Sequence, residues 1–136
     1  RVALAESAHA ELFITLDAGA SLSIQLLCSP DAEEYTLFTY DGAARVVSLS
    51  TEKSSLNADP DRLNITASHH ASGDIVTLRV FVDGSIIEAF VDDTTVITTR
   101  AYPTRADSTR IVVSALDEES CLRTCTVWAM RSIFIE

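Results

Sequence analysis

Short runs of alternating hydrophobic and polar residues make up most of the chain. These runs are rich in Val, Ile, Thr, Phe and Tyr, and residues such as Asp, Gly, Asn, Pro and Ser separate them. Such spacing is typical of antiparallel strands joined by turns, and no long helical period competes with it. The pattern predicts strands over residues 11–16, 21–28, 35–40, 44–50, 63–69, 75–82, 85–91, 95–102, 110–115 and 122–135.

This strand content determines the fold that we expect. Many short strands without helices are most simply accommodated in two stacked sheets. We therefore predict an all-β fold, a two-sheet antiparallel β-sandwich of the jelly-roll-like or concanavalin-like kind. The 136 residues suit a single module over residues 1–136, because a chain of this size can bury about two-thirds of its unfolded surface. The polar segment 50–62 is predicted to be the longest loop and not a domain boundary.

Asp83-Gly84 predicts the most informative local structure, a β-hairpin. Asp-Gly between two β-rich runs favours a two-residue turn, and such a turn would place Arg79 opposite Glu88. Alternation then gives an apolar face that we expect in the core, made by Leu78, Val80, Val82, Ile87, Ala89 and Val91. The opposite, mixed face is made by Arg79, Phe81, Ile86, Glu88 and Phe90. A second turn at Asp92-Asp93 extends the pair into a three-stranded meander.

The charge balance narrows the classes of partner. The chain has 20 acidic and 10 basic residues, a formal charge of −10, which repels phosphate backbones and anionic lipids. No apolar run approaches the roughly 20 residues of a membrane-spanning helix. We therefore predict neither a nucleic-acid nor a membrane partner. Because the sequence starts at Arg1 without a signal segment, we expect a processed product or an excised piece.

The cysteines and histidines do not suggest a metal site. Cys28, Cys121 and Cys125 cannot all pair within one chain, and the last two lack the second ligand pair of a zinc site. Buried or singly disulfide-bonded cysteines are the preferred interpretation. His69 and His70 point to opposite faces of a strand, so we expect a surface pair at a strand end. No metal and no cofactor are predicted.

Two other features suggest contact with carbohydrate. Asn64-Ile65-Thr66 is an N-glycosylation acceptor pattern, which is meaningful only in a eukaryotic secretory context. The aromatic residues Tyr35, Tyr40, Tyr102 and Trp128 are candidates for stacking on sugar rings. Trp128 lies in an apolar closing segment and is predicted in the core. Tyr102, before a proline at a strand end, is the better candidate for exposure.

The run LRVFVDGSIIEAFVDDTTVITTRAYP, residues 78–103, resembles the signature of the C-terminal module of glycoside hydrolase family 32, the invertase, inulinase, levanase and fructosyltransferase group. The signature F-V-D-x-S, x-x-E-x-F and R-x-Y-P is carried by Phe81, Val82, Asp83, Ser85, Glu88, Phe90, Arg100, Tyr102 and Pro103. Segments 34–41 and 128–134 are also similar, so the resemblance covers nearly the whole chain. It departs at a shorter turn over 92–96 and at Lys53, where an Arg is common.

The resemblance implies a parent enzyme whose five-bladed β-propeller holds the catalytic carboxylates. The propeller motifs N-D-P-N-G, R-D-P and E-C do not occur in this chain: Asn57-Ala58-Asp59-Pro60 continues with Asp61, and Cys121 follows Ser120. A retaining glycosidase needs two carboxyl groups about 5 Å apart. For Asp83 we expect a role in the turn, and for Glu88 cross-strand pairing, so no catalytic residue is predicted.

Three hypotheses follow. In the first, the module supports the catalytic propeller of a secreted β-fructofuranosidase-type parent that acts on sucrose, inulin or levan, and takes part in contacts of a homo-oligomer. In the second, a similarity in fold to a fructan-binding module family implies that this chain holds fructan or fructose, with Asp83, Glu88, Arg79 and Tyr102 as sugar-binding residues. The third, an enzyme in its own right, lacks the carboxylate arrangement. An exposed apolar patch favours docking, whereas a shallow polar pocket with an aromatic residue favours binding.

Overall fold

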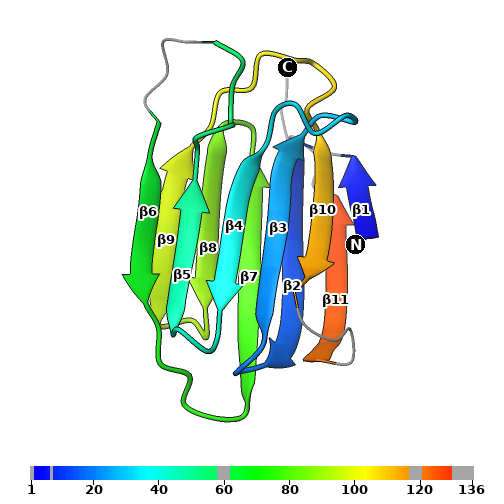
Figure 1. Ribbon diagram of the computed structural model, residues 1–136. Coiled ribbons are helices and arrows are strands. Elements are labelled where there is room, and N and C mark those ends of the chain that lie inside the picture. Colours follow the sequence, from blue (N-terminus) through cyan, green and yellow to red (C-terminus); the bar gives the residue numbers. More distant parts are fainter. Residues whose placement is uncertain (1, 7, 58–61, 117–120, 130–136) are drawn as a thin grey trace, which may run out of the picture.

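Two antiparallel sheets stacked face to face form the molecule (Figure 1). The computed structural model describes residues 2–6, 8–57, 62–116 and 121–129. The six-stranded sheet runs in the order β1 (Val2–Glu6), β10 (Arg110–Ala115), β3 (Ser21–Cys28), β4 (Thr36–Asp41), β5 (Val46–Ser50) and β6 (Asn64–Ser68). The five-stranded sheet runs in the order β11 (Leu122–Ala129), β2 (His9–Asp17), β7 (Ile75–Asp83), β8 (Ile86–Val91) and β9 (Thr95–Arg100). The predicted all-β sandwich is confirmed.

Each predicted strand has a counterpart, with small differences at the ends. β1 was not predicted, because its sequence Val-Ala-Leu-Ala-Glu has little alternation and contains alanine, which is depleted in strands. β2 begins earlier and β5 later than expected. The predicted closing strand is confirmed as far as Ala129, and residues 130–135 lie outside the described residues. The loop predicted over 50–62 is confirmed for 51–57, and residues 58–61 are likewise not described.

Strict alternation of buried and half-exposed residues produces the core. Along β2 every second side chain is buried, and β7 and β8 repeat this pattern. The inward side chains are almost all Leu, Ile, Val and Ala, which fit the space between two pleated sheets. The predicted core face of the β7–β8 hairpin is confirmed, since all six of its side chains are fully buried.

The turn of this hairpin lies one residue later than predicted. Asp83 pairs with Ile86, so the two turn residues are Gly84 and Ser85. Gly84 has a φ of +61°, and glycine at the first central position is preferred in a type II′ turn. The preference of Asp-Gly for a type I′ turn is therefore overridden.

This move changes the cross-strand partners by two residues. Arg79 lies opposite Phe90, and Glu88 lies opposite Phe81, so the predicted pairing of Arg79 with Glu88 is wrong. A shift of two keeps every side chain on its own face of the sheet. The assignment of residues to the core face and to the mixed face therefore survives the error in register. The second predicted turn, at Asp92-Asp93, is confirmed, and both residues have positive φ.

A buried carboxylate fixes the loops at one end of the sandwich. Glu34 accepts hydrogen bonds from the amides of Leu56, Thr104 and Arg105 and from the hydroxyls of Thr104 and Ser108. Burial raises the pKa of Glu34, but these hydrogen bonds outweigh it and bring the pKa to about 2. The carboxylate thus ties the loop after β5 to the connection between β9 and β10.

Two side chains differ from the sequence-based expectation. His69 is buried, 4% exposed, because its amide continues the pairing with β5 by donating to Arg45 O, and alternation places its side chain on the inner side with Ile65 and Ala67. There its Nε2 lies 2.8 Å from Asp92 Oδ2 and its Nδ1 lies 2.7 Å from Thr95 Oγ1. The predicted surface histidine pair is therefore wrong for His69. Trp128 is 50% exposed and not in the core, because it points away from the six-stranded sheet.

Cys28 is buried, whereas Cys125, within β11, and Cys121, immediately before it, are half-buried. Within the described ranges, no group of three or more His, Cys, Asp and Glu residues is placed to hold a metal ion. Across the same ranges, no helix has the length and hydropathy needed to cross a membrane.

Candidate functional site

The outer face of the five-stranded sheet carries a concentration of aromatic side chains. The strand register arranges them in two rows that run across the sheet. One row is Thr126, Phe13, Arg79, Phe90 and Val96. The neighbouring row is Trp128, Glu11, Phe81, Glu88 and Thr98. We call these ten residues the aromatic face.

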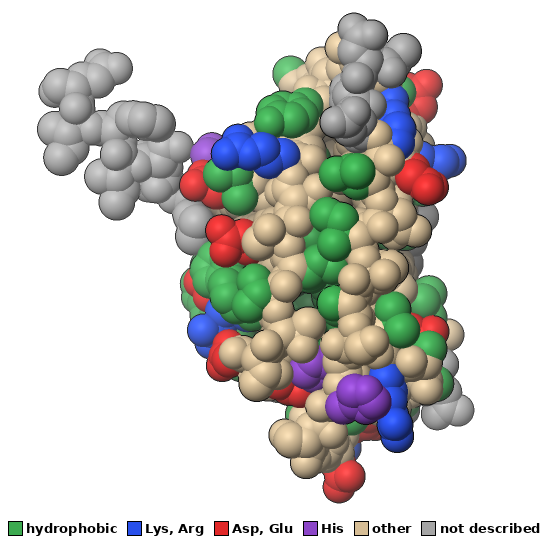
Figure 2. Space-filling model, turned by 90° about the vertical axis from the view of Figure 1, so that its left-hand side faces the viewer, with side chains coloured by type: hydrophobic (Ala, Val, Ile, Leu, Met, Phe, Trp, Pro, Cys, Tyr) green, Lys and Arg blue, Asp and Glu red, His purple; other side chains and the backbone are tan. Residues whose placement is uncertain are grey.

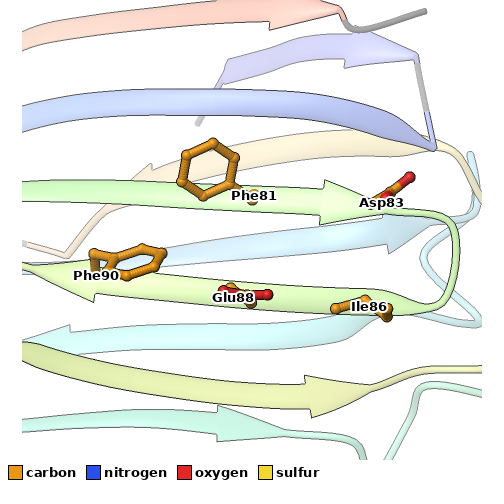
Figure 3. A pocket seen from close by; sticks show the side chains of 5 residues that line it. All are labelled: Phe81, Asp83, Ile86, Glu88 and Phe90. Carbon is orange, nitrogen blue, oxygen red and sulfur yellow. The ribbon is translucent and has the colours of Figure 1, made fainter. Parts of the chain in front are cut away.

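A hollow of about 400 Å³ lies on this face, lined by Phe81, Asp83, Ile86, Glu88 and Phe90. Figure 3 shows Phe81 and Asp83 projecting from β7 and the other three side chains from β8. The rings of Phe81 and Phe90 meet edge to face, with centroids 5.8 Å apart and an interplanar angle of 86°. This geometry is a favourable one for an aromatic pair, so the two rings form a firm apolar wall.

Arg79 does not point into the hollow. Its Nε lies 3.7 Å from Glu11 Oε1, and its guanidinium stacks over the Phe13 ring, 5.4 Å from the centroid. The cation and the ring attract each other through the ring quadrupole. The side chain of Arg79, on β7, therefore contacts the neighbouring strand β2, where it compensates Glu11 and not Glu88.

Glu88 is left with an uncompensated carboxylate. The side chain is half-buried beside Phe81 and Phe90. Among the described residues, no hydrogen bond or ion pair joins the Glu88 carboxylate to another group. A carboxylate next to aromatic rings is less well hydrated than a fully exposed one, so a cation or a pair of hydroxyl groups would be favourable there.

Asp83 lies at the rim of the hollow. Its Oδ1 is 2.7 Å from His9 Nδ1, and both side chains are well exposed. An exposed pair of this kind contributes little to stability. The structure therefore brings Asp83 and Glu88 to one hollow, as a sugar-binding role would require, but gives them different surroundings.

Tyr102 lies away from this hollow. It is 54% exposed, as predicted, and lines two other depressions, one beside Gly84 and Ser85 and one of about 360 Å³ with Leu63, Ile65 and Arg100. The other tyrosines do not offer free rings, since Tyr40 is buried with its hydroxyl donating to Ala18 O, and Tyr35 is half-buried. Alternation along the sequence places Phe81, Ile86 and Phe90 on the mixed face, but they were not predicted as lining residues. Alternation was the signal that could have found them.

Comparisons with known proteins fit this architecture. The structure is similar to exo-inulinase from Aspergillus awamori, with a TM-score of 0.85 and 17% identity over 98% of this chain and 27% of that one. It is also similar to sucrose-6-phosphate hydrolase from Lactobacillus gasseri, with a TM-score of 0.71 and 22% identity over 98% and 27% of the two chains. Sheep galectin-11 matches with a TM-score of 0.63 and 10% identity over 93% of this chain and 95% of its own. At these identities the likeness shows the fold alone.

The chain spans about a quarter of the length of the two enzymes, in which this domain accompanies a catalytic domain. No curated protein matches the sequence. The family model described as "Glycosyl hydrolases family 32 C terminal" matches residues 3–129. The match covers the strands of both sheets and the hairpin with the F-V-D-x-S signature, and the chain therefore belongs to the family 32 glycosyl hydrolase C-terminal domains.

Proposed function

We propose that this chain is the non-catalytic C-terminal module of a secreted β-fructofuranosidase-type glycoside hydrolase and that it packs against the catalytic β-propeller through its aromatic face. The observation that carries the docking role is the aromatic face itself. Trp128 and Val96 are 50% and 52% exposed, and three half-buried Phe rings lie between them in the rows. Contiguous apolar and aromatic surface of this kind marks protein interfaces.

The charge pattern of the face suits such an interface. Glu11 is compensated by Arg79, so a partner that covers the face would bury a charge pair there and not an isolated carboxylate. Glu88 is uncompensated and supplies a point where a cationic side chain of the propeller would fit. The large similar enzymes support this partner, since the domain accompanies a catalytic domain in them.

The test is a binding titration between this chain and the separately produced propeller of its parent. We expect Phe81→Ser to weaken binding at least about 30-fold, the loss of roughly 2 kcal/mol typical of a central aromatic contact. Leu37→Ser is the matched control, because Leu37 is an equally half-buried outer residue of the other sheet. Equal binding by the two variants would refute docking through the aromatic face.

The hollow favours a second candidate function, fructan binding by the module itself. A carboxylate such as Glu88 can accept hydrogen bonds from neighbouring sugar hydroxyls while an aromatic ring packs on the apolar side of the sugar. Calorimetric titration of the chain with inulin-type and levan-type oligosaccharides tests it, with sucrose and a glucan oligomer as controls. Saturable heat with fructans that Glu88→Gln abolishes would support binding, even at a Kd of about 1 mM, worth roughly 4 kcal/mol. Absence of heat would leave docking as the function.

For the parent protein we further propose a substrate class and contacts between copies, and for the isolated chain the absence of glycosidase activity. The parent's substrates are proposed to be the β-fructofuranosyl units of sucrose, inulin or levan, because the similar structures include an inulinase and a sucrose-6-phosphate hydrolase. Contacts between copies in a homo-oligomer are testable by the sedimentation of the parent. The isolated chain is expected to show no glycosidase activity, and turnover of sucrose by the purified chain would contradict this.

A further inference from the structure

The six-stranded sheet has an open edge at β6. β6 has β5 on one side and no strand on the other in the described part of the chain. The amide of Thr51 donates to Leu63 O, and the amide of His69 donates to Arg45 O. These bonds flank β6 and face β5, so residues 64, 66 and 68 direct their amides and carbonyls to the open side.

This edge lacks the usual protection against pairing with another strand. Exposed edges are normally blunted by charges, proline or a bulge. The sequence of β6 is Asn-Ile-Thr-Ala-Ser, without a charge or a proline, and its pairing with β5 is regular. The other three edge strands each contain a charged residue: Glu6 in β1, Arg100 in β9 and Arg123 in β11. An uncharged β-rich edge favours strand-to-strand association.

Apolar side chains around the β6 edge also favour association with another strand. Figure 2 looks onto this side of the molecule and shows hydrophobic side chains, among backbone and other side chains, over its middle. Leu63 and Tyr102 are about half exposed and line the depression between β6 and β9. An added strand would therefore find free backbone groups and apolar contacts together.

The same edge strand carries the acceptor tripeptide Asn64-Ile65-Thr66. Asn64 and Thr66 are both exposed, and as residues i and i+2 of a strand they lie on the same outer face. Neither side chain has a hydrogen-bond partner among the described residues. The Asn64 amide nitrogen is thus open to solvent at the beginning of the strand.

We propose that Asn64 carries an N-linked oligosaccharide and that this glycan covers the open edge of β6. The glycan would come from a polyprenyl-pyrophosphate-linked oligosaccharide. A bond forms between Asn64 Nδ2 and the anomeric carbon, the bond from that carbon to the pyrophosphate oxygen breaks, and the amide loses one proton to the released pyrophosphate. The bulky hydrophilic chain would keep a second strand away from residues 64–68. This proposal rests on the secretion of the parent in the proposed function, but it concerns the sheet opposite the aromatic face and so does not depend on docking.

Intact-mass measurement tests the modification. The whole chain is secreted from yeast, and its mass is compared before and after treatment with a peptide N-glycosidase. The mass loss on treatment is expected for the native chain and for Thr66→Ser, and is expected to disappear in Asn64→Gln and Thr66→Ala. Asn57→Gln is the matched control, because Asn57, the other asparagine of the chain, is followed by Ala58-Asp59 without a hydroxyl. A native chain without glycan mass would overturn the proposal.

Sedimentation tests the covering of the edge. The Asn64→Gln chain is expected to self-associate as its concentration rises, whereas the glycosylated chain stays monomeric. Adding Ser68→Lys to Asn64→Gln should restore the monomer, since a lysine on an edge strand opposes pairing. Identical sedimentation of the glycosylated and Asn64→Gln chains would show that the glycan does not protect this edge.

Discussion

The two outer faces of the sandwich arise from the same alternation but carry different chemistry. Across the six-stranded sheet the register aligns a row of hydroxyl side chains, Ser114, Ser23, Thr39, Ser48 and Thr66. The corresponding row of the five-stranded sheet contains Trp128, Glu11, Phe81, Glu88 and Thr98. We call the outer face of the six-stranded sheet, which carries this row together with neighbours such as Leu37 and Val46, the hydroxyl face.

The difference between the two outer faces indicates which of them contacts a partner. Both sheets contribute fully buried inner side chains to one core, so stability does not require large apolar residues on either outside. Short hydroxyl side chains are well solvated and suit a face that stays in water. Aromatic rings on the other face gain their full contact area only when a partner covers them. The comparison therefore favours the aromatic face as the one that meets the propeller.

The largest expected effect is the loss of the Glu34 hydrogen bonds that hold the loops at one end of the sandwich. Glu34→Ala removes the acceptor of five hydrogen bonds and leaves one buried and several part-buried donors without it. We expect a loss of about 3 kcal/mol in the free energy of unfolding. Urea unfolding followed by circular dichroism measures it. A loss below about 1 kcal/mol would show that water or loop movement replaces the carboxylate.

The same carboxylate predicts sensitivity to acid. The pKa of Glu34 in the folded protein is about 2, below its ordinary 4.5. A lowered pKa contributes stability that is complete above the unfolded pKa and lost as the pH falls from about 4.5 to about 2, up to roughly 3 kcal/mol. Thermal unfolding across this range should show a smaller dependence on pH for Glu34→Gln than for the native chain. Parallel pH profiles for the two chains would contradict this account.

A smaller effect is expected within the aromatic face. Arg79→Ala removes the contact with the Phe13 ring and the ion pair with Glu11. We expect a loss of about 1 kcal/mol, because both groups are partly exposed. Arg79→Lys keeps the charge but not the planar stacking and should fall between Arg79→Ala and the native chain. If Arg79→Lys lost as much free energy of unfolding as Arg79→Ala, as measured in urea, charge would be unimportant at this position.

The smallest effect is expected on the hydroxyl face. Ser48→Ala should change the free energy of unfolding by no more than about 0.5 kcal/mol, because the side chain lies half-exposed in the hydroxyl row. It should also leave binding to the propeller unchanged. A clear loss of binding in this variant would shift the docking surface to the six-stranded sheet and reverse the comparison.

The sequence was sufficient for the fold class and for the faces of the strands. Alternation placed Leu78, Val80 and Val82 in the core, since the period of two is a local property of the chain. The exact register of the β7–β8 hairpin could not be predicted, because the choice between turns at Asp83-Gly84 and Gly84-Ser85 depends on contacts with neighbouring strands. The error in register assigned Arg79 to Glu88, whereas the structure assigns it to Glu11 on β2.

The candidate site was predictable in part. Asp83 and Glu88 were singled out from the signature, and they do share a hollow. Trp128 was misplaced because Val127 and Ala129 on either side of it suggested an apolar strand, although alternation alone could not decide which of the two faces was inside. Burial of His69 depends on Asp92 and Thr95, which come from a distant turn. Such long-range contacts leave no local pattern in the sequence.

Hydroxyl-radical footprinting of the parent enzyme beside the isolated chain tests the central claim most directly. The method reports how accessible each side chain is to solvent, so the two outer faces can be compared in one sample. The account predicts that oxidation of Phe81, Phe90 and Trp128 falls in the parent, while Leu37 and Val46 on the hydroxyl face react equally in both. Unchanged oxidation of the three aromatic residues, or protection confined to the hydroxyl face, would contradict it.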